Sequence, residues 1–228
     1  MGETLTQRLE IIRNQIARAA EKANRNPGEI KLVAVSKTHP AAKIREAIEA
    51  GGRVFGENKV QEAEGKIAEI GRENAEWHLI GHLQSNKARK AVRLFDVIHS
   101  LDSRELAERL ERICVEENRE KLSVFGQVDL GRETTKNGIE EKDLPALVEF
   151  LRRAKHLKFD GLMVVPPFFE DSEKVRPFFR RLREIRDAVC PQGELSMGMS
   201  HDFTVAIEEG ATVIRVGTAI FGERGYQN

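Results

Sequence analysis

The segment Lys31-Leu32-Val33-Ala34-Val35-Ser36-Lys37 sets the pattern for the whole chain, because it is an apolar strand that ends on an amine. Thr38-His39-Pro40 follows at once and stops the strand. An ammonium group at the mouth of a buried strand loses solvation, which lowers its pKa and leaves part of it neutral and nucleophilic. Such an amine can form a Schiff base with an aldehyde. From this segment alone, a lysine that extends its amine into solvent is the simpler interpretation.

Seven more apolar segments follow, and helical segments separate them. We expect strands over 32–36, 54–55, 77–82, 97–101, 124–130, 161–165, 195–199 and 213–216. We expect helices over 4–24, 41–50, 59–73, 87–94, 144–154, 173–189 and 203–209, and one more that Asp102 and Glu105 cap.

This alternation indicates parallel strands joined by right-handed crossovers, and eight such strands close a barrel that its own side chains fill. A doubly wound open sheet is the alternative, but it usually has about five or six strands. The sequence therefore predicts the α/β class and a single-domain (β/α)8 TIM barrel over residues 1–228, with an extra N-terminal helix.

The composition excludes several classes of partner. The 37 basic and 37 acidic side chains cancel, which argues against a nucleic-acid or anionic-membrane surface. No apolar run reaches the roughly 18 residues that span a membrane, and the N-terminus lacks the features of a secretory signal. Cys114 and Cys190 lie apart and are typical of packing residues in a reducing compartment. We expect a cytoplasmic, monomeric protein that binds neither nucleic acid nor membrane.

The last predicted strand ends in a pattern that suits a phosphate group. Gly217 lets the backbone approach a ligand closely, and Thr218-Ala219 can open a short helix with free N–H groups. In barrels of this kind the loops after strands seven and eight form the usual phosphate site, and Ser200 adds a hydroxyl from strand seven. The alternative is a plain glycine turn beside a buried ion pair between Arg215 and a carboxylate. A phosphate at one end and the Lys37 amine at the other together suggest a phosphorylated aldehyde.

At this point the residues match a family. Motifs in the same order run along nearly the whole chain: Val33-Ala34-Val35-Ser36-Lys37, Phe55-Gly56-Glu57-Asn58, Trp77-His78-Leu79-Ile80-Gly81, Ile98-His99-Ser100-Leu101-Asp102-Ser103, Glu133 with Lys136 and Gly138, Gly161-Leu162-Met163, and Leu195-Ser196-Met197-Gly198-Met199-Ser200 continuing to Arg215-Val216-Gly217-Thr218-Ala219-Ile220-Phe221-Gly222. With these motifs the chain resembles the pyridoxal-phosphate homeostasis proteins, single-domain relatives of the barrel domain of alanine racemase.

The resemblance implies a role for six residues. Lys37 would bear pyridoxal 5'-phosphate (PLP) as an internal aldimine, and Asn58 would line the ring pocket. Arg215 would face the pyridine nitrogen. The phosphate would be held by Ser200, Gly217 and Thr218. The chain departs from the family pattern at Lys59, His82 and Asp129, where an aromatic residue, a proline and an asparagine are more common. Because Asp129 lacks the side-chain amide of that asparagine, any contact that the amide makes in the family is in doubt here.

The reactivity of the cofactor follows from Arg215. The pyridine ring is a strong electron sink when its nitrogen is protonated, and an arginine cannot accept a hydrogen bond from that N–H. The racemases of this fold also use a tyrosine from a second domain, whereas the one tyrosine here, Tyr226, lies near the end of the chain. We therefore expect a protein of vitamin B6 homeostasis that carries and buffers PLP, and PLP-dependent apoenzymes are the expected recipients. A weak racemase-like enzyme is the alternative, and a sugar-phosphate enzyme that uses Lys37 is a third hypothesis.

Other polar residues invite weaker hypotheses. His78 and His82 suggest a metal pair, but four residues along a strand separate them by about 13 Å, so each is better interpreted as a packing residue or a pocket group. His201 beside Asp202 suggests a base with its orienting carboxylate, although helix capping by Asp202 is the better interpretation. Lys87 and Lys136 either neutralise an anion near the mouth or are solvated loop lysines.

Overall fold

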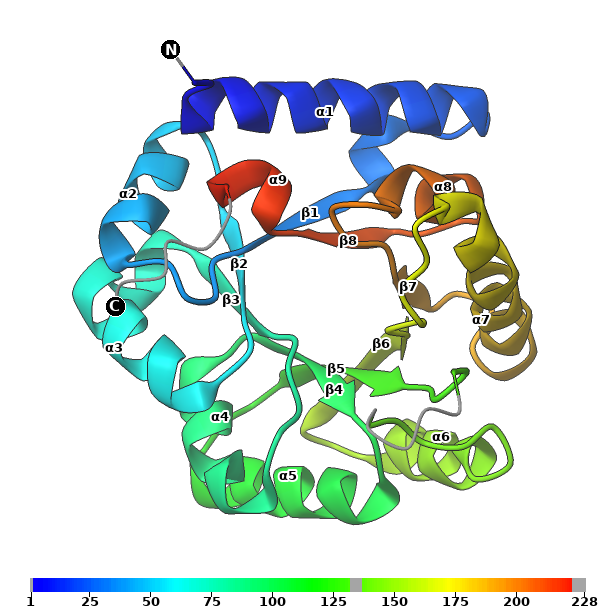
Figure 1. The fold of residues 1–228 in the computed structure, drawn as a ribbon. Helices are drawn as coiled ribbons and strands as arrows, with labels where there is room; N and C mark the ends of the chain where they lie inside the picture. Colours follow the sequence, from blue (N-terminus) through cyan, green and yellow to red (C-terminus); the bar gives the residue numbers. More distant parts are fainter. Residues whose placement is uncertain (1, 132–136, 223–228) are drawn as a thin grey trace.

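The computed structural model describes residues 2–131 and 137–222, and these residues form a closed barrel of eight parallel strands inside a ring of helices (Figure 1). The strands are β1 Lys31–Val35, β2 Val54–Glu57, β3 Glu76–Leu79, β4 Val97–Leu101, β5 Leu122–Gln127, β6 Leu157–Met163, β7 Glu194–Ser196 and β8 Val213–Val216. The α-helices are α1 Leu5–Lys22, α2 Ala41–Glu49, α3 Val60–Ile70, α4 Ala88–Leu94, α5 Arg104–Glu116, α6 Leu144–Arg153, α7 Arg176–Val189, α8 Phe203–Glu208 and α9 Thr218–Phe221. The 3-10 turns are η1 Pro27–Glu29, η2 Arg72–Asn74, η3 Ser85–Lys87 and η4 Ser172–Val175.

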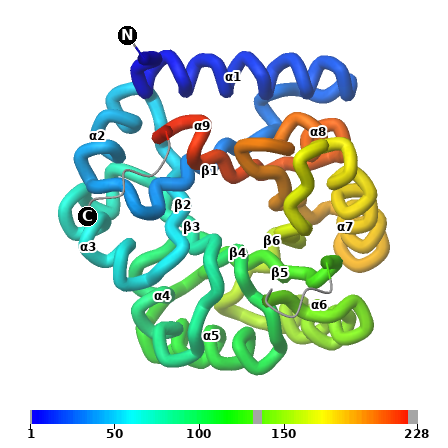
Figure 2. Tube along the Cα trace, viewed as in Figure 1, coloured from blue at the N-terminus to red at the C-terminus, as the bar shows by residue number. Residues whose placement is uncertain are grey.

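The barrel closes because each strand pairs with the next and β8 returns to β1. The β1–β8 register runs from Lys31 opposite Val213 to Ala34 opposite Val216. Figure 2 shows the same closure along the chain, with the first and last strands side by side. The predicted barrel is confirmed, and the open sheet is excluded.

The extra N-terminal helix is confirmed as well. The Thr4 side chain accepts a hydrogen bond from Gln7 N–H, and the Gln7 side chain accepts one from Thr4 N–H, so that the two residues form a capping box at the start of α1. Leu9, Ile12 and Ile16 form a buried stripe. This stripe packs α1 across α2, α8 and α9, outside the ring of helices (Figure 1).

Several expected boundaries shift for identifiable reasons. Helix α3 ends at Ile70, not at residue 73, because Gly71 adopts a φ of 90°. Helix α7 begins at Arg176, after the 3-10 turn η4, since Pro177 has no N–H to donate to the preceding turn. The predicted cap of α5 was wrong: Ser103 is the N-cap and accepts from Leu106 N–H at 3.2 Å, whereas Asp102 lies 3.1 Å from His82 Nδ1.

The apolar core has two parts. Most buried side chains lie between the strands and the helices. A smaller cluster fills part of the barrel interior and consists of Val33, Val97, Phe125, Met163 and Val213. Each fully buried aliphatic side chain contributes about 1.5–3 kcal/mol of transfer free energy. The small size of the inner cluster leaves space in the barrel for polar side chains.

The two cysteines occupy packing positions, as the sequence predicts. Cys114 is buried and Cys190 half-buried, both are free thiols, and burial raises the pKa of each to about 11. Over the described ranges no helix is both long and apolar enough to cross a membrane.

Candidate functional site

The mouth of the barrel holds a cavity of about 330 Å³, within the range of small-molecule pockets. It lies at the carboxyl ends of the strands, where the active sites of such barrels are found. All six residues that the resemblance assigns to a cofactor line it: Lys37, Asn58, Ser200, Arg215, Gly217 and Thr218. Residues far apart in the sequence, from the ends of β1, β2, β7 and β8, therefore meet in one cavity.

Lys37 lies at the β1 side of this cavity and is half-buried. Its place follows from strand alternation, because Val33 and Val35 point into the barrel and Lys37 is the next residue of that series. The following residue, Thr38, has a φ of 66°, which is unusual for a β-branched side chain. The backbone that presents Lys37 is therefore strained and needs support from its neighbours.

That support comes from a group we call the Lys66 cluster, which consists of Lys66, Glu57 and Glu62. Lys66 Nζ donates to Glu57 Oε1 at 2.8 Å and to Glu62 Oε1 at 2.7 Å. It also donates to the Ser36 carbonyl at 2.7 Å, while the Ser36 hydroxyl donates to Glu57 Oε1 at 2.6 Å. Glu62 accepts from the Thr38 N–H. The cluster thus holds the residues on both sides of Lys37.

The cluster is charged and largely buried. Glu57 is fully buried and only 8% of Lys66 is exposed. Burial raises the pKa of Glu57, and the ion pair and hydrogen bond from Lys66 only partly oppose this effect. Burial also acts to raise the pKa of Glu62, but the hydrogen bonds from Lys66 and Thr38 outweigh it, and the net shift is downward.

The opposite wall of the cavity is built from backbone amides. Ser200 Oγ accepts from Gly217 N–H at 3.1 Å and from Ala219 N–H at 3.5 Å, so the first turn of α9 faces the Ser200 hydroxyl. The Thr218 N–H has no acceptor among the described residues. A Cβ at position 217 would lie 3.2 Å from the Val35 carbonyl oxygen, tight against β1. This wall suits the oxygens of an anion such as a phosphate.

Arg215 forms the floor of the cavity and is only 4% exposed. One terminal nitrogen donates to Ser196 Oγ at 2.6 Å and the other to the Val164 carbonyl at 2.9 Å. No carboxylate within the described ranges forms an ion pair with it, so the buried Arg–carboxylate pair considered above was wrong. Burial lowers the pKa of Arg215 to about 10, against a smaller opposing effect of Asp202, so the guanidinium is still charged at neutral pH.

The remaining walls are suited to a flat ring. Val35, Ile80 and Val165 supply apolar surface, and Asn58 adds a polar group at the end of β2. Phe168 at the rim is 74% exposed and contacts the His201 ring at 5.6 Å between centroids. The cavity thus combines an amine, a guanidinium, an amide-lined wall and an apolar slot.

The weaker hypotheses fare differently. His78 is buried in the barrel while His82 is exposed and pairs with Asp102, and no group of metal-ligating side chains occurs in the described part of the chain. His201 Nε2 lies 2.9 Å from the Glu170 carbonyl, not against Asp202. Asp202 occupies the N-cap position of α8, but its carboxylate accepts from Met199 N–H instead, so capping was wrong as well.

All three departures from the family pattern, including His82, lie away from the cavity lining. Lys59 is exposed at the N-cap of α3, and the Asp129 carboxylate accepts from Gly131 N–H within its own loop. Lys87 is half-buried in η3 and does not line the cavity. Glu133, Lys136 and Tyr226 lie outside the described residues.

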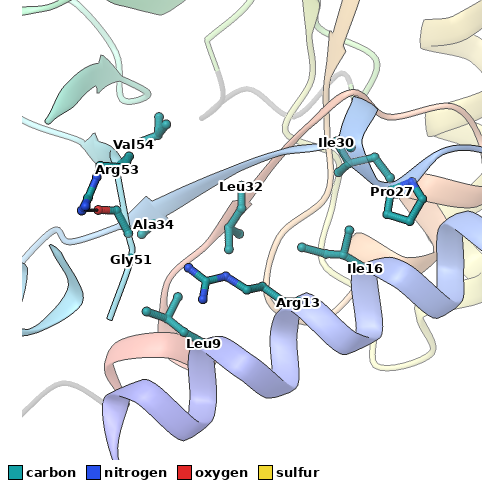
Figure 3. A pocket seen from close by; sticks show the side chains of 12 residues that line it. Leu9, Arg13, Ile16, Pro27, Ile30, Leu32, Ala34, Gly51, Arg53 and Val54 are labelled. Atoms are coloured by element: carbon teal, nitrogen blue, oxygen red, sulfur yellow. Dashed lines mark hydrogen bonds between the residues drawn. The ribbon is translucent and has the colours of Figure 1, made fainter. Parts of the chain in front are cut away.

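A second cavity, of about 420 Å³, lies between α1 and the outer face of β1 (Figure 3). Its floor is apolar, with Leu9, Ile16 and Leu32, and two arginines stand at its edge. Arg13 donates to the Ala50 carbonyl and Arg53 to the Ile48 and Gly52 carbonyls. Since the described residues that line this cavity include no nucleophile or acid–base group, we assign the functional site to the mouth of the barrel.

Comparisons with known proteins point to one family. Residues 8–225 match the family model of the N-terminal domain of alanine racemase. Over 225 residues the chain is 43% identical to the pyridoxal phosphate homeostasis protein of Aquifex aeolicus (strain VF5), and the match covers 96% of this chain and 98% of that relative.

Solved structures agree with this result. The structure of PipY from Synechococcus elongatus PCC7942 with PLP bound is 44% identical, with a TM-score of 0.83 over 96% of this chain and 100% of that chain. Alanine racemase from Corynebacterium glutamicum shares the fold at a TM-score of 0.62 and 18% identity, over 96% of this chain and 63% of that chain.

Proposed function

The chain belongs to the pyridoxal phosphate homeostasis protein family, and from this we propose that it binds PLP at the mouth of the barrel, attached to Lys37, and serves as a cytoplasmic carrier and buffer of the cofactor. One observation supports this above the others. A single cavity has a lysine on one wall and backbone amides with a serine hydroxyl on the other. These two walls match the aldehyde and the phosphate of PLP, while Arg215 between them faces the ring.

The covalent step is a simple condensation. The Lys37 amine adds to the aldehyde carbon, the nitrogen replaces the aldehyde oxygen, and one water molecule leaves. PLP supplies an aldehyde that reacts with amines and a ring that can delocalise negative charge. The Ser36 and Thr38 contacts of the Lys66 cluster fix the backbone from which Lys37 extends. The apolar walls Val35, Ile80 and Val165 limit the access of water to the bond.

Arg215 sets the limit on catalysis. It has only N–H donors, so it can donate a hydrogen bond to an unprotonated ring nitrogen. It has no acceptor with which to stabilise a protonated ring nitrogen. A ring held in this way stabilises a carbanion weakly. The other titratable side chains that line the described cavity are His39, whose ring stacks on Phe221, and His201, which bonds to the Glu170 carbonyl. We therefore propose that the protein holds and delivers PLP and does not turn over amino acids.

The variant Lys37→Ala tests the covalent attachment. The wild-type protein with PLP should show a visible absorption band, and Lys37→Ala should lose it. Non-covalent binding should survive in Lys37→Ala, because Ser200, Gly217 and Thr218 are unchanged. Lys59→Ala is the matched control, since this exposed lysine lies one residue beyond Asn58 and should retain the band. A band that persists in Lys37→Ala, or the loss of all binding in a folded Lys37→Ala protein, would contradict the proposal.

Two further measurements separate the carrier from the enzymes considered above. Incubation of the loaded protein with amino acids in deuterated water should give no more α-proton exchange than free PLP gives; faster exchange would support a weak racemase-like activity instead. The loaded protein should also reactivate a PLP-dependent apoenzyme. Binding of sugar phosphates without any visible band on addition of PLP would favour a sugar-phosphate enzyme.

A further inference from the structure

The interior of the barrel contains a continuous line of polar side chains that the proposed function does not use. Barrels of this kind are normally filled by layers of branched apolar residues. Here Ser196, His99 and His78 are each at most 1% exposed and occupy inward positions of β7, β4 and β3. Buried polar groups are costly unless every member finds a partner. Their partners therefore determine what the line can do.

Every neighbouring pair in the line is within hydrogen-bond distance. Arg215 donates to Ser196 Oγ at 2.6 Å, and Ser196 Oγ lies 2.8 Å from His99 Nδ1. His99 Nε2 lies 2.8 Å from His78 Nδ1, and His78 Nε2 lies 2.8 Å from Glu76 Oε1. Glu76 Oε1 also accepts from Lys31 Nζ at 3.2 Å. The line thus runs from the cavity floor to the first residues of β1 and β3 at the opposite end of the barrel.

The two ends of the line specify one arrangement of protons. Arg215 can only donate, so Ser196 accepts from it and can give its own proton to His99 Nδ1. His99 then carries its proton on Nε2 and donates to His78 Nδ1. His78 in turn carries its proton on Nε2 and donates to Glu76, which as a carboxylate can only accept. Both histidines are neutral Nε2–H tautomers, and all four donors point away from the cavity.

The electrostatic surroundings favour this neutral, directional state. Burial lowers the pKa of His78 and lowers that of His99 well below its usual value, and His78, Arg215 and Lys31 add to the effect on His99. The hydrogen bond from His78 lowers the pKa of Glu76 to about 2, so the acceptor end is ionised at neutral pH. The His99 ring also stacks on Phe125, with centroids 4.5 Å apart, which fixes its plane.

We propose that His99, His78 and Glu76 are positioning residues for Arg215. They form a histidine relay, a one-way chain of hydrogen bonds that fixes the orientation of the Ser196 hydroxyl and of the guanidinium at the cavity floor. The relay couples the charge on Glu76, at the far end of the barrel, to the cavity. Its consequence for PLP affinity rests on the proposed function, whereas the proton arrangement itself does not.

Neutralising the far end gives the sharpest test. Glu76→Gln keeps an acceptor oxygen but adds an amide that can donate to His78 Nε2, so both proton directions become possible. Because 38% of the Glu76 side chain is exposed, this variant should fold. Glu194→Gln is the matched control: Glu194 is half-buried and begins β7 at the same end of the barrel, but has no histidine partner within the described residues.

The readout is the nitrogen-15 NMR spectrum of the histidine rings in the PLP-free protein, which distinguishes the two tautomers. In the wild type, His99 and His78 should both be Nε2–H tautomers. In Glu76→Gln, the signals of both rings should move toward the average of the two tautomers, and Glu194→Gln should leave them unchanged. A wild-type His99 protonated on Nδ1, or His99 signals that do not respond to Glu76→Gln, would overturn the proposal.

PLP affinity then tests the coupling to the cavity. Misplacing one hydrogen-bond donor costs about 0.5–1.5 kcal/mol, so Glu76→Gln should weaken PLP binding about 2- to 12-fold and Glu194→Gln should not change it. An unchanged affinity in Glu76→Gln, with shifted tautomers, would contradict the coupling. If the wild type does not bind PLP at all, the proposed function fails, but the NMR experiment still decides whether the relay exists.

Discussion

The Lys66 cluster and the histidine relay support the cavity in two different ways. The cluster consists of full charges beside β1 and β2, and it bonds to the backbone on both sides of Lys37. The relay consists of two neutral imidazole rings in the barrel interior with the Glu76 carboxylate at their far end, and Ser196 connects it to the side chain of Arg215. Removing the charge of Lys66 leaves the buried Glu57 carboxylate without its cation. Changing the relay only redistributes protons.

This difference teaches what each device can do. A buried ion pair fixes geometry strongly and responds little to its surroundings, so the Lys66 cluster is suited to hold a covalent anchor. A neutral chain of hydroxyl and imidazole groups has two proton arrangements of similar energy, and its ends select between them. We therefore expect a large loss of stability when Lys66 is removed from the cluster, and smaller changes, visible at the cavity, from changes to the relay.

Lys66→Met should have the largest effect. It leaves the fully buried Glu57 carboxylate without its cation, and breaking a buried pair in this way costs about 3–5 kcal/mol. Urea denaturation should show this loss in the free energy of unfolding. Most of it should return in Lys66→Met/Glu57→Gln, which removes the unpaired charge. Lys90→Met, which breaks the exposed pair with Glu64, should cost less than about 1 kcal/mol.

Acid should weaken the fold through the relay. Histidines in the unfolded chain titrate near pH 6.5, whereas burial lowers the pKa of both His78 and His99 in the folded state. Below about pH 6.5 the unfolded chain therefore binds protons that the folded chain does not, and the free energy of unfolding falls as the pH falls. The slope should be at most about 1.4 kcal/mol per pH unit for each histidine.

The charges around the rings modify this slope without changing its sign. Glu76 and Asp96 favour protonated His78 and Lys31 opposes it; His78, Arg215 and Lys31 oppose protonation of His99. Urea unfolding between about pH 5 and pH 8 measures the slope. His99→Phe keeps an aromatic ring against Phe125 and removes one of the two groups, so its slope should be smaller. An unchanged slope would assign the proton uptake to groups outside the relay.

Glu62→Gln should have the smallest effect on stability. Glu62 is the partly exposed member of the Lys66 cluster and accepts from the Thr38 N–H and from Lys66. A glutamine keeps the acceptor but loses the charge, which should cost about 0.5–1.5 kcal/mol in urea unfolding. It should also slow the appearance of the visible band with PLP, because Thr38 and the backbone of Lys37 are less firmly held. Glu64→Gln, on the same helix, should change neither quantity.

The sequence was sufficient for the fold, and the six residues that the resemblance assigns to a cofactor lie in one cavity. Short apolar strands that alternate with helices determine a closed barrel, and the topology then brings Lys37 to the same mouth as Ser200 and Gly217. The errors are local ones. Ser103, not Asp102, caps α5, because two capping residues in succession cannot be ranked without the backbone path.

The supports of the cavity were harder to predict. Lys66 looks like a solvated helix lysine, although its spacing of four residues from Glu62 was a usable signal. His99 and Ser196 are polar residues inside apolar strands, and their meeting depends on the stagger of β4 against β7 around the barrel. Strands β4 and β7 are not neighbours in the sheet, so their side chains meet only across the interior of the closed barrel. The distance of 2.8 Å between His99 Nδ1 and Ser196 Oγ therefore could not be predicted from the order of the strands.

Borohydride reduction of the PLP-loaded protein tests the central claim most directly. Reduction converts a Schiff base into a stable secondary amine, and peptide mass spectrometry then identifies the modified lysine. The account predicts one modified site, Lys37, at close to one PLP per chain, with no label in Lys37→Ala. A reduced adduct on any other lysine, such as Lys59 or Lys66, with Lys37 unmodified, would contradict it.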